Sequence, residues 1–242
     1  MEACRHAHGL HTMGQYLQAL ALYERVAEDC ELVLARIPTE DVLSASAEDL
    51  HSCALKATLD IAPHLAASAR HHSCEGQHGI AVQSYARLLR ACRRVLSCDL
   101  LLSSDMYESA ANIYAGLLPE SLRAVRDACS LGERRKAQGV CMEAVKVYSH
   151  ALEVCEHVLE RTSASLPMRA EAEQLHVLVL EGALAASTEA FHAASVDLQD
   201  QGRSPKAAHA LAQVLVTCKQ VISARQLGDD QTFNEAAHKL YR

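Results

Sequence analysis

One pattern of residues occurs four times along the 242-residue chain, and this recurrence limits the possible folds more than any other feature. The copies are GQYLQALALYERVAEDCELVL from Gly14, GQHGIAVQSYARLLRACRRVL from Gly76, GVCMEAVKVYSHALEVCEHVL from Gly139 and GRSPKAAHALAQVLVTCKQVI from Gly202. Their first residues are 62, 63 and 63 positions apart (76 − 14, 139 − 76 and 202 − 139). Self-similarity at a fixed period indicates that one structural unit is repeated.

Four positions recur in the copies: a glycine, an alanine five residues later, a tyrosine four further on, which is leucine in the fourth copy, and a cysteine seven beyond that. These spacings place the last three on one face of an α-helix. We predict that the glycine separates two helices, since glycine adopts a left-handed conformation without cost, and that the other three positions form the core. The positions are Gly14, Ala19, Tyr23 and Cys30; Gly76, Ala81, Tyr85 and Cys92; Gly139, Ala144, Tyr148 and Cys155; and Gly202, Ala207, Leu211 and Cys218.

The segments between the copies are also predicted to be helical, because their apolar residues recur at spacings of three and four. Each unit then has a helix of roughly 22 residues followed by one of roughly 30. Pro63 and Pro119 should kink or split the long helices. The apolar positions are Leu43, Ala47, Leu50, Ala54, Ile61, Leu65 and Ala69; Met106, Ala110, Ile113, Leu117, Ala124, Ala128 and Leu131; and Met168, Ala172, Leu175, Val179, Ala186 and Ala190.

The composition agrees with an all-α fold. Half of the chain is apolar, yet only 4% is aromatic and Trp is absent. Ala and Leu must therefore fill most of the core, which favours helices, since strands favour β-branched and aromatic residues. A helix pair cannot bury its apolar face alone, whereas stacked pairs form a solenoid with a continuous core. We predict one helical-repeat domain over residues 1–242, with units starting near 14, 76, 139 and 202 and the first and last units incomplete.

Charge and hydropathy exclude several classes of protein. The net charge of −7 argues against nucleic-acid binding, which needs a basic surface. The sequence contains neither a signal-peptide pattern nor an apolar run of membrane-spanning length, so we expect a soluble, cytoplasmic protein with no membrane partner. The ten cysteines are scattered through helical patterns and are expected to be reduced.

The polar residues bear on catalysis and metal binding. The sequence lacks a Gly-x-Ser-x-Gly elbow, a phosphate-binding glycine loop and a His-Glu-x-x-His motif, so neither an enzyme nor a cofactor is expected. Two clusters hold Cys and His at short spacing, as zinc sites do. We favour polar turns and helix surface for both clusters, with zinc binding as the alternative; they comprise His71, His72, Cys74 and His78, and Cys4, His6 and His8.

A basic stripe interrupts the acidic chain in the second copy. Arg87, Arg90 and Arg94 share one helical face. The matching region of the first copy carries Glu28 and Glu31, and that of the third is acidic too. The favoured interpretation is a solvated face with salt bridges between neighbouring units, and the alternative is docking of an acidic peptide or partner.

The segment GQYLQALALYERV resembles the second helix of a tetratricopeptide repeat, and SAANIYAGLL, which contains Asn112, resembles that family's first helix. The long helix through YERVAEDCELVLARIP is similar to the extended repeats of kinesin light chains. The period of 62 to 63 residues is nearly twice the family's period of about 34. The resemblance implies a right-handed superhelical solenoid of antiparallel helix pairs, which binds a peptide or partner helix without catalysis. It also places Tyr107, Asn112 and Tyr114 on the helix type that lines the groove.

Two functions are therefore expected for the chain, a protein-binding adaptor or a structural subunit buried in a larger cytoskeletal or transport assembly. A single helical hairpin of the microtubule-interacting-and-transport type also resembles MGQYLQALALYERV, but that module would occur once, and four copies argue against it. Phe233, Ala237 and Leu240 give the last helix an apolar side. Since solenoid ends need covering, self-association or complex formation through an end face is expected.

Overall fold

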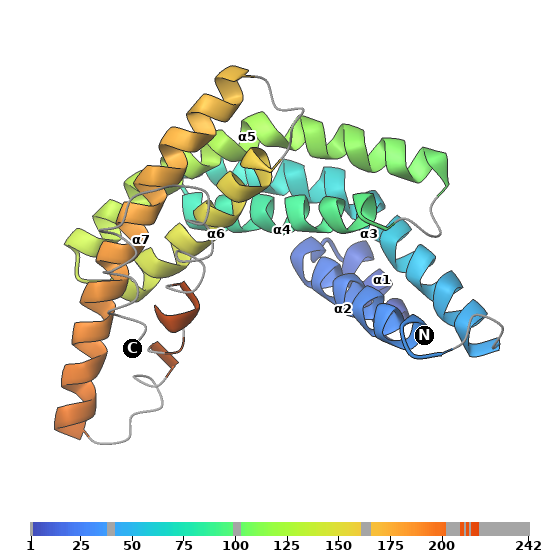
Figure 1. Ribbon diagram of the computed structural model, residues 1–242, viewed down its shortest axis with the longest axis horizontal. Coiled ribbons are helices and arrows are strands. Elements are labelled where there is room, and N and C mark those ends of the chain that lie inside the picture. Colours follow the sequence, from blue (N-terminus) through green and yellow to red (C-terminus); the bar gives the residue numbers. More distant parts are fainter. Residues whose placement is uncertain are drawn as a thin grey trace. The chain divides into compact units, whose positions relative to one another are not determined.

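The computed structural model describes residues 2–37, 42–98, 103–160, 166–201, 209, 210, 212 and 214–217. Within these ranges the chain contains helices and no strand, which confirms the all-α prediction. Predictions for Gly202, Ala207, Leu211, Cys218 and the segment 229–242 lie outside the described residues. The helices are α1 (Glu2–Thr12), α2 (Tyr16–Leu34), α3 (Val42–Cys74), α4 (His78–Leu96), α5 (Ser104–Ala137), α6 (Cys141–Leu159) and α7 (Leu166–Gln201) (Figure 1).

Short and long helices alternate after α1. Helices α2, α4 and α6 each have 19 residues, whereas α3, α5 and α7 have 33, 34 and 36. Pro63 and Pro119 lie inside α3 and α5 without ending them, so the prolines do not split these helices, and the alternative of a kink stays a prediction. Both prolines are on the exposed side, where a carbonyl that loses its helical donor can bind water. None of the described helices is both long enough and apolar enough to cross a membrane.

Three glycines end the helices that precede α2, α4 and α6. Gly14, Gly76 and Gly139 have φ angles of 75°, 74° and 75°. At the end of α1, the N–H of Gly14 donates to the carbonyl of His11 (3.0 Å) and the N–H of Gln15 to that of Leu10 (2.9 Å). This is the Schellman pattern, which favours glycine because of its positive φ. The predicted helix ends at these glycines are confirmed.

The chain folds as two compact units. Unit 1 comprises residues 1–76 and 87–120, and unit 2 comprises 77–86 and 121–242, so that α4 and α5 contribute to both. In unit 1, α2 packs against α1 and α3; in unit 2, α6 packs against α7. The assignment of residues 1–242 to one helical-repeat domain stays a prediction.

The aligned core positions are buried in all three described copies. Their cysteines are free thiols, and a free cysteine packs in a helical core as a small hydrophobic residue. Burial raises the pKa of Cys92 to about 12 and also raises that of Cys155, so both thiols stay protonated and unreactive. The buried residues are Ala19, Tyr23, Cys30, Ala81, Tyr85, Cys92, Ala144, Tyr148 and Cys155.

The ring of Tyr148 on α6 lies between two helix glycines of unit 2. A Cβ atom placed on Gly132 of α5 would lie 2.5 Å from the ring's Cζ, and one on Gly182 of α7 would lie 2.4 Å from it. The hydroxyl reaches the edge of the core and donates to Glu133 Oε1 at 2.7 Å. Only glycine lets α5 and α7 approach the ring this closely, because any side chain would overlap it.

Candidate partner-binding surfaces

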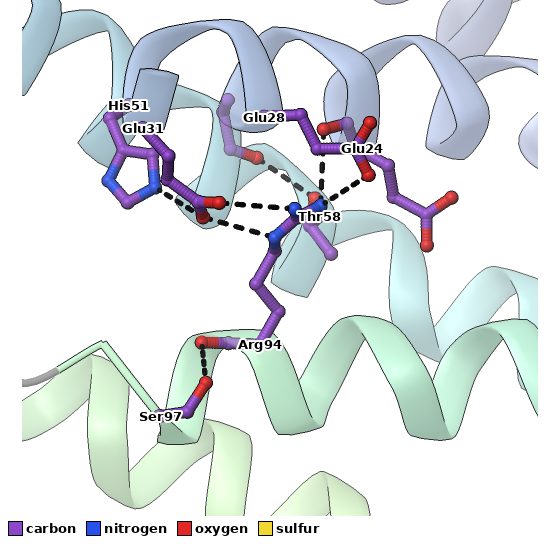
Figure 2. Close-up of polar contacts among 8 residues, drawn as sticks. Glu24, Glu28, Glu31, His51, Thr58, Arg94 and Ser97 are labelled. Atoms are coloured by element: carbon purple, nitrogen blue, oxygen red, sulfur yellow. Dashed lines mark hydrogen bonds and ion pairs between the residues drawn. The ribbon is translucent and has the colours of Figure 1, made fainter. Parts of the chain in front are cut away.

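Arg94 of the basic stripe pairs with acidic residues of α2 inside unit 1. Its Nε and Nη2 atoms donate to the two carboxylate oxygens of Glu31 at 3.1 and 3.2 Å. Its Nη1 atom donates to Glu28 Oε1 and to the carbonyl of Glu24, both at 3.2 Å (Figure 2). A bidentate ion pair between a guanidinium and a carboxylate is among the stronger polar contacts. Arg94 therefore joins α4 to α2.

Glu31 also contacts α3. His51 Nε2 lies 3.3 Å from Glu31 Oε1, and Figure 2 shows the carboxylate between His51 and Arg94. The His51 side chain is only 3% exposed, so this contact is partly shielded from water. One carboxylate on α2 thus holds polar groups from both α3 and α4, and the cluster is a structural connection within unit 1.

The other two arginines of the stripe, Arg87 and Arg90, interact electrostatically with Glu24 on α2. Burial raises the pKa of the Glu24 carboxyl, and the positive charges of Arg90, Arg87 and Arg94 oppose that rise. The structure thus brings the basic stripe of the second copy together with the acidic residues of the first. This agrees with the salt-bridge interpretation, and an acidic partner would have to compete with Glu24 and its neighbours for the stripe.

The three candidates taken from the family resemblance differ in exposure. Tyr107 and Asn112 are exposed on α5, where a partner could reach them. Tyr114 is 2% exposed. This corrects its assignment to a binding surface, because its ring packs in the core and offers a partner almost no area.

The side chains of the two predicted Cys and His clusters are not arranged as metal ligands. His71 and Cys74 are exposed and His72 is half-buried, while His78 Nδ1 lies 3.8 Å from Asp127 Oδ2. Within the described ranges, no three His, Cys, Asp or Glu side chains are placed to hold a metal ion. The placement of these side chains therefore gives the zinc alternative no support.

The structure reveals a pocket that the sequence patterns did not indicate. It lies in unit 1 between α2 and α3, near the start of α1, and its volume is about 650 Å³. Its wall is mainly apolar, and the two charged groups among its described lining residues are carboxylates. The lining residues are Ala3, Val26, Asp29, Cys30, Val33, Ser46, Ala47, Asp49, Leu50 and Cys53.

Large apolar side chains are exposed on the two helices that form the pocket. Leu32 and Val33 stand near the end of α2, and Val42 and Leu43 at the start of α3. Leu43 is one helical turn before Ala47 of the pocket wall. Grouped apolar exposure of this kind marks interaction sites. One sequence signal was available: Asp29 occupies the position that the alignment gives to Ala91 and Val154.

Comparisons of the chain with protein-family models, with curated proteins and with solved structures gave no match.

Proposed function

We propose that this chain is a non-catalytic scaffold of the cytoplasm, a tetratricopeptide-like, right-handed solenoid of about four units that binds a protein or peptide partner. The alternation of 19-residue helices with helices of 33 to 36 residues supports the repeat. Burial of the same alanine, tyrosine and cysteine positions in α2, α4 and α6 supports it too. Repeat solenoids offer long surfaces that suit protein partners.

The pocket of unit 1 is the observation that carries the proposal. A cavity of about 650 Å³ is large enough for several side chains of a partner. Val33 lines it while 37% exposed, and Leu32 and Leu43 are exposed nearby. Covering these side chains would remove apolar surface from water, which drives protein association.

The alternative function, a structural subunit of a larger assembly, is favoured by a second apolar surface. Val177, Leu178 and Val196 are all exposed on α7 in unit 2. An adaptor with one binding site needs only one such surface, whereas a subunit surrounded by neighbours needs several.

The test is affinity capture of the full-length tagged chain from its native source, with mass spectrometry of the retained proteins. The wild type is compared with Val33→Ser/Leu43→Ser in unit 1 and with the matched Val177→Ser/Leu178→Ser in unit 2. An adaptor should lose its partner only with the unit 1 variant. A structural subunit should retain a fixed set of proteins in high salt and lose members with the unit 2 variant. Retention of no protein under any condition would contradict both functions.

A further inference from the structure

An apolar stripe that is covered on α4 and α6 is open on α2. The alignment pairs the pocket residues Val26, Asp29 and Val33 with Leu88, Ala91 and Val95 and with Ala151, Val154 and Val158. All six residues of α4 and α6 are 2% exposed or less. On α2, Val33 is 37% exposed and Asp29 is exposed. The aligned positions are therefore buried by neighbouring residues in the second and third copies, whereas two of the three are exposed to solvent in the first.

The surroundings of the pocket are helical. α1, α3 and α5 all end two residues before a glycine with positive φ, so α1 corresponds to the last part of the long helices. α2 packs against α1 and α3, and the pocket between α2 and α3 includes Ala3 of α1 in its lining. An occupant beside Val33 would therefore lie among helices, and an amphipathic helix suits an apolar groove of this kind.

The charges of the pocket distinguish its occupant from the chain's own long helices. Asp29 replaces the small apolar residues of α4 and α6, and Asp49 on α3 supplies a second carboxylate. The described residues of the lining include neither Lys nor Arg. Covering a carboxylate with apolar groups alone is costly, whereas a nearby cation compensates the loss of water. The occupant must therefore carry positive charge beside its apolar side chains.

We propose that the unit 1 pocket binds an amphipathic α-helix of a partner protein, with aliphatic side chains on one face and Lys or Arg beside them. The inference rests on the proposed function and names its class of partner. The aliphatic side chains would contact Val33 and Leu50, and the cations would pair with Asp29 and Asp49. The partner helix would cover the side of α2 on which Asp29 and Val33 are exposed.

The experiment uses the full chain and two synthetic probes of about 18 residues, long enough to form helix when bound. Both have Leu at spacings of three and four; one has Lys at its polar positions and the other has Glu. Binding is measured by fluorescence anisotropy at physiological salt. We expect the Lys peptide to bind about tenfold more tightly than the Glu peptide, and Asp29→Lys and Val33→Ser each to weaken it by about tenfold.

Two matched variants separate this site from general attraction to an acidic protein. Glu108→Lys on α5 makes the same charge change as Asp29→Lys on an exposed position outside the lining, and Val177→Ser makes the same change as Val33→Ser in unit 2. Both should bind the Lys peptide like wild type. Cys53 is exposed and lines the pocket, whereas Cys74 is exposed outside it. Saturating peptide should slow alkylation of Cys53 and leave that of Cys74 unchanged.

Equal affinity for the two peptides, equal weakening by the matched variants, or equal protection of both thiols would overturn the inference. So would a self-association of the wild type that excludes the peptide and is abolished by Val33→Ser, since a second copy would then occupy the pocket. If the peptides fail but cellular partners are lost with Val33→Ser/Leu43→Ser, the proposed function stands and only the class of partner is wrong.

Discussion

Helices α2 and α6 have the same length and the same start, but they are buried to very different extents. Each has 19 residues and follows a glycine with a φ of 75°. α2 buries six of its residues, whereas α6 buries eleven. The aligned residues Val33 and Val158 show the contrast, since the first is 37% exposed and the second is fully buried.

This difference separates what a repeated sequence determines from what its neighbours determine. The shared glycine, alanine, tyrosine and cysteine set where each helix begins and which face enters the core. The extent of the core depends on the residues that pack against each helix from elsewhere in the chain. α2, which packs on α1 and α3, keeps an apolar stripe that water still reaches.

The largest effect is expected at Tyr148, in the closely packed unit 2. Tyr148→Ala empties the space between Gly132 and Gly182, neither of which has a side chain to fill it. We expect a loss of about 4 kcal/mol in the free energy of unfolding, measured by urea denaturation. Tyr16 of unit 1 is half-buried and stacks on His64 with ring centroids 5.1 Å apart. Tyr16→Ala should cost only about 1 kcal/mol.

A double-mutant cycle tests the cause assigned to this effect. Gly182→Ala alone should destabilise the protein by about 2 kcal/mol because the new methyl group overlaps the ring. In the Tyr148→Ala background the same substitution should stabilise α7 by about 0.5 kcal/mol, since alanine is the better helix former. Additive effects of the two substitutions would show that the ring and Gly182 are not in contact.

The second prediction compares the aligned valines directly. Val158→Ala removes two buried methyl groups from α6 and should cost about 2 kcal/mol in the free energy of unfolding. Val33→Ala on α2 should cost less than about 0.5 kcal/mol, because the residue is already partly in water. Chemical denaturation of both variants checks the difference. Equal costs would mean that α2 is covered in solution as fully as α6.

The helices could be predicted from the sequence to a large extent. The glycine turns, the alternation of short and long helices and the buried alanine, tyrosine and cysteine positions all follow from local periodicity and backbone preferences. The continuity of α3 and α5 through their prolines could not be predicted, because it depends on which side of the helix faces water. Pro63 and Pro119 lie on the exposed side, and this is known only once the packing is known.

The binding surface was harder to predict because it depends on contacts between distant residues. Arg94 lies 63 positions from Glu31 in the sequence, and their pairing joins two helices. Tyr114 has the same residue type as the exposed Tyr107, and only its packing shows that it is buried. The pocket is lined by residues of α1, α2 and α3, so it depends on how whole elements pack. The one local indication of the pocket in the sequence was Asp29, which aligns with the apolar residues Ala91 and Val154 of the other copies.

The third prediction uses pH to compare the aligned cysteines. Burial raises the pKa of Cys92 to about 12, from an ordinary value near 9. Between these pH values the unfolded chain releases the thiol proton and the folded chain keeps it, so stability present below pH 9 is lost as the pH rises. At pH 10 the loss should be about 1.4 kcal/mol relative to pH 7. The slope of unfolding free energy against pH should be smaller for Cys92→Ser than for wild type.

Cys30 is the control for this pH dependence. Burial also raises its pKa, with smaller contributions from neighbouring charges, but its thiol lines the open pocket, where water stabilises the thiolate. Cys30→Ser should therefore flatten the slope less than Cys92→Ser does. Identical slopes for the two variants would indicate that the interior beside α2 is as dry as that beside α4.

The smallest effect is expected where α2 is held to α4 by charge. Arg94→Met removes the bonds to Glu28 and Glu31. Both carboxylates are about half exposed, so solvent screening limits the loss to about 1 kcal/mol in the free energy of unfolding, and less in high salt. The control is Arg70→Met, which breaks the ion pair between Arg70 and Glu120. Arg70 is more exposed than Arg94, so its loss should cost only about 0.3 kcal/mol.

The double exchange Arg94→Glu/Glu31→Arg should recover part of the free energy lost in Arg94→Met. A loss that salt does not change would mean that the hydrocarbon stem of Arg94 contributes by packing on α2, and that apolar contact rather than charge holds α2 to α4.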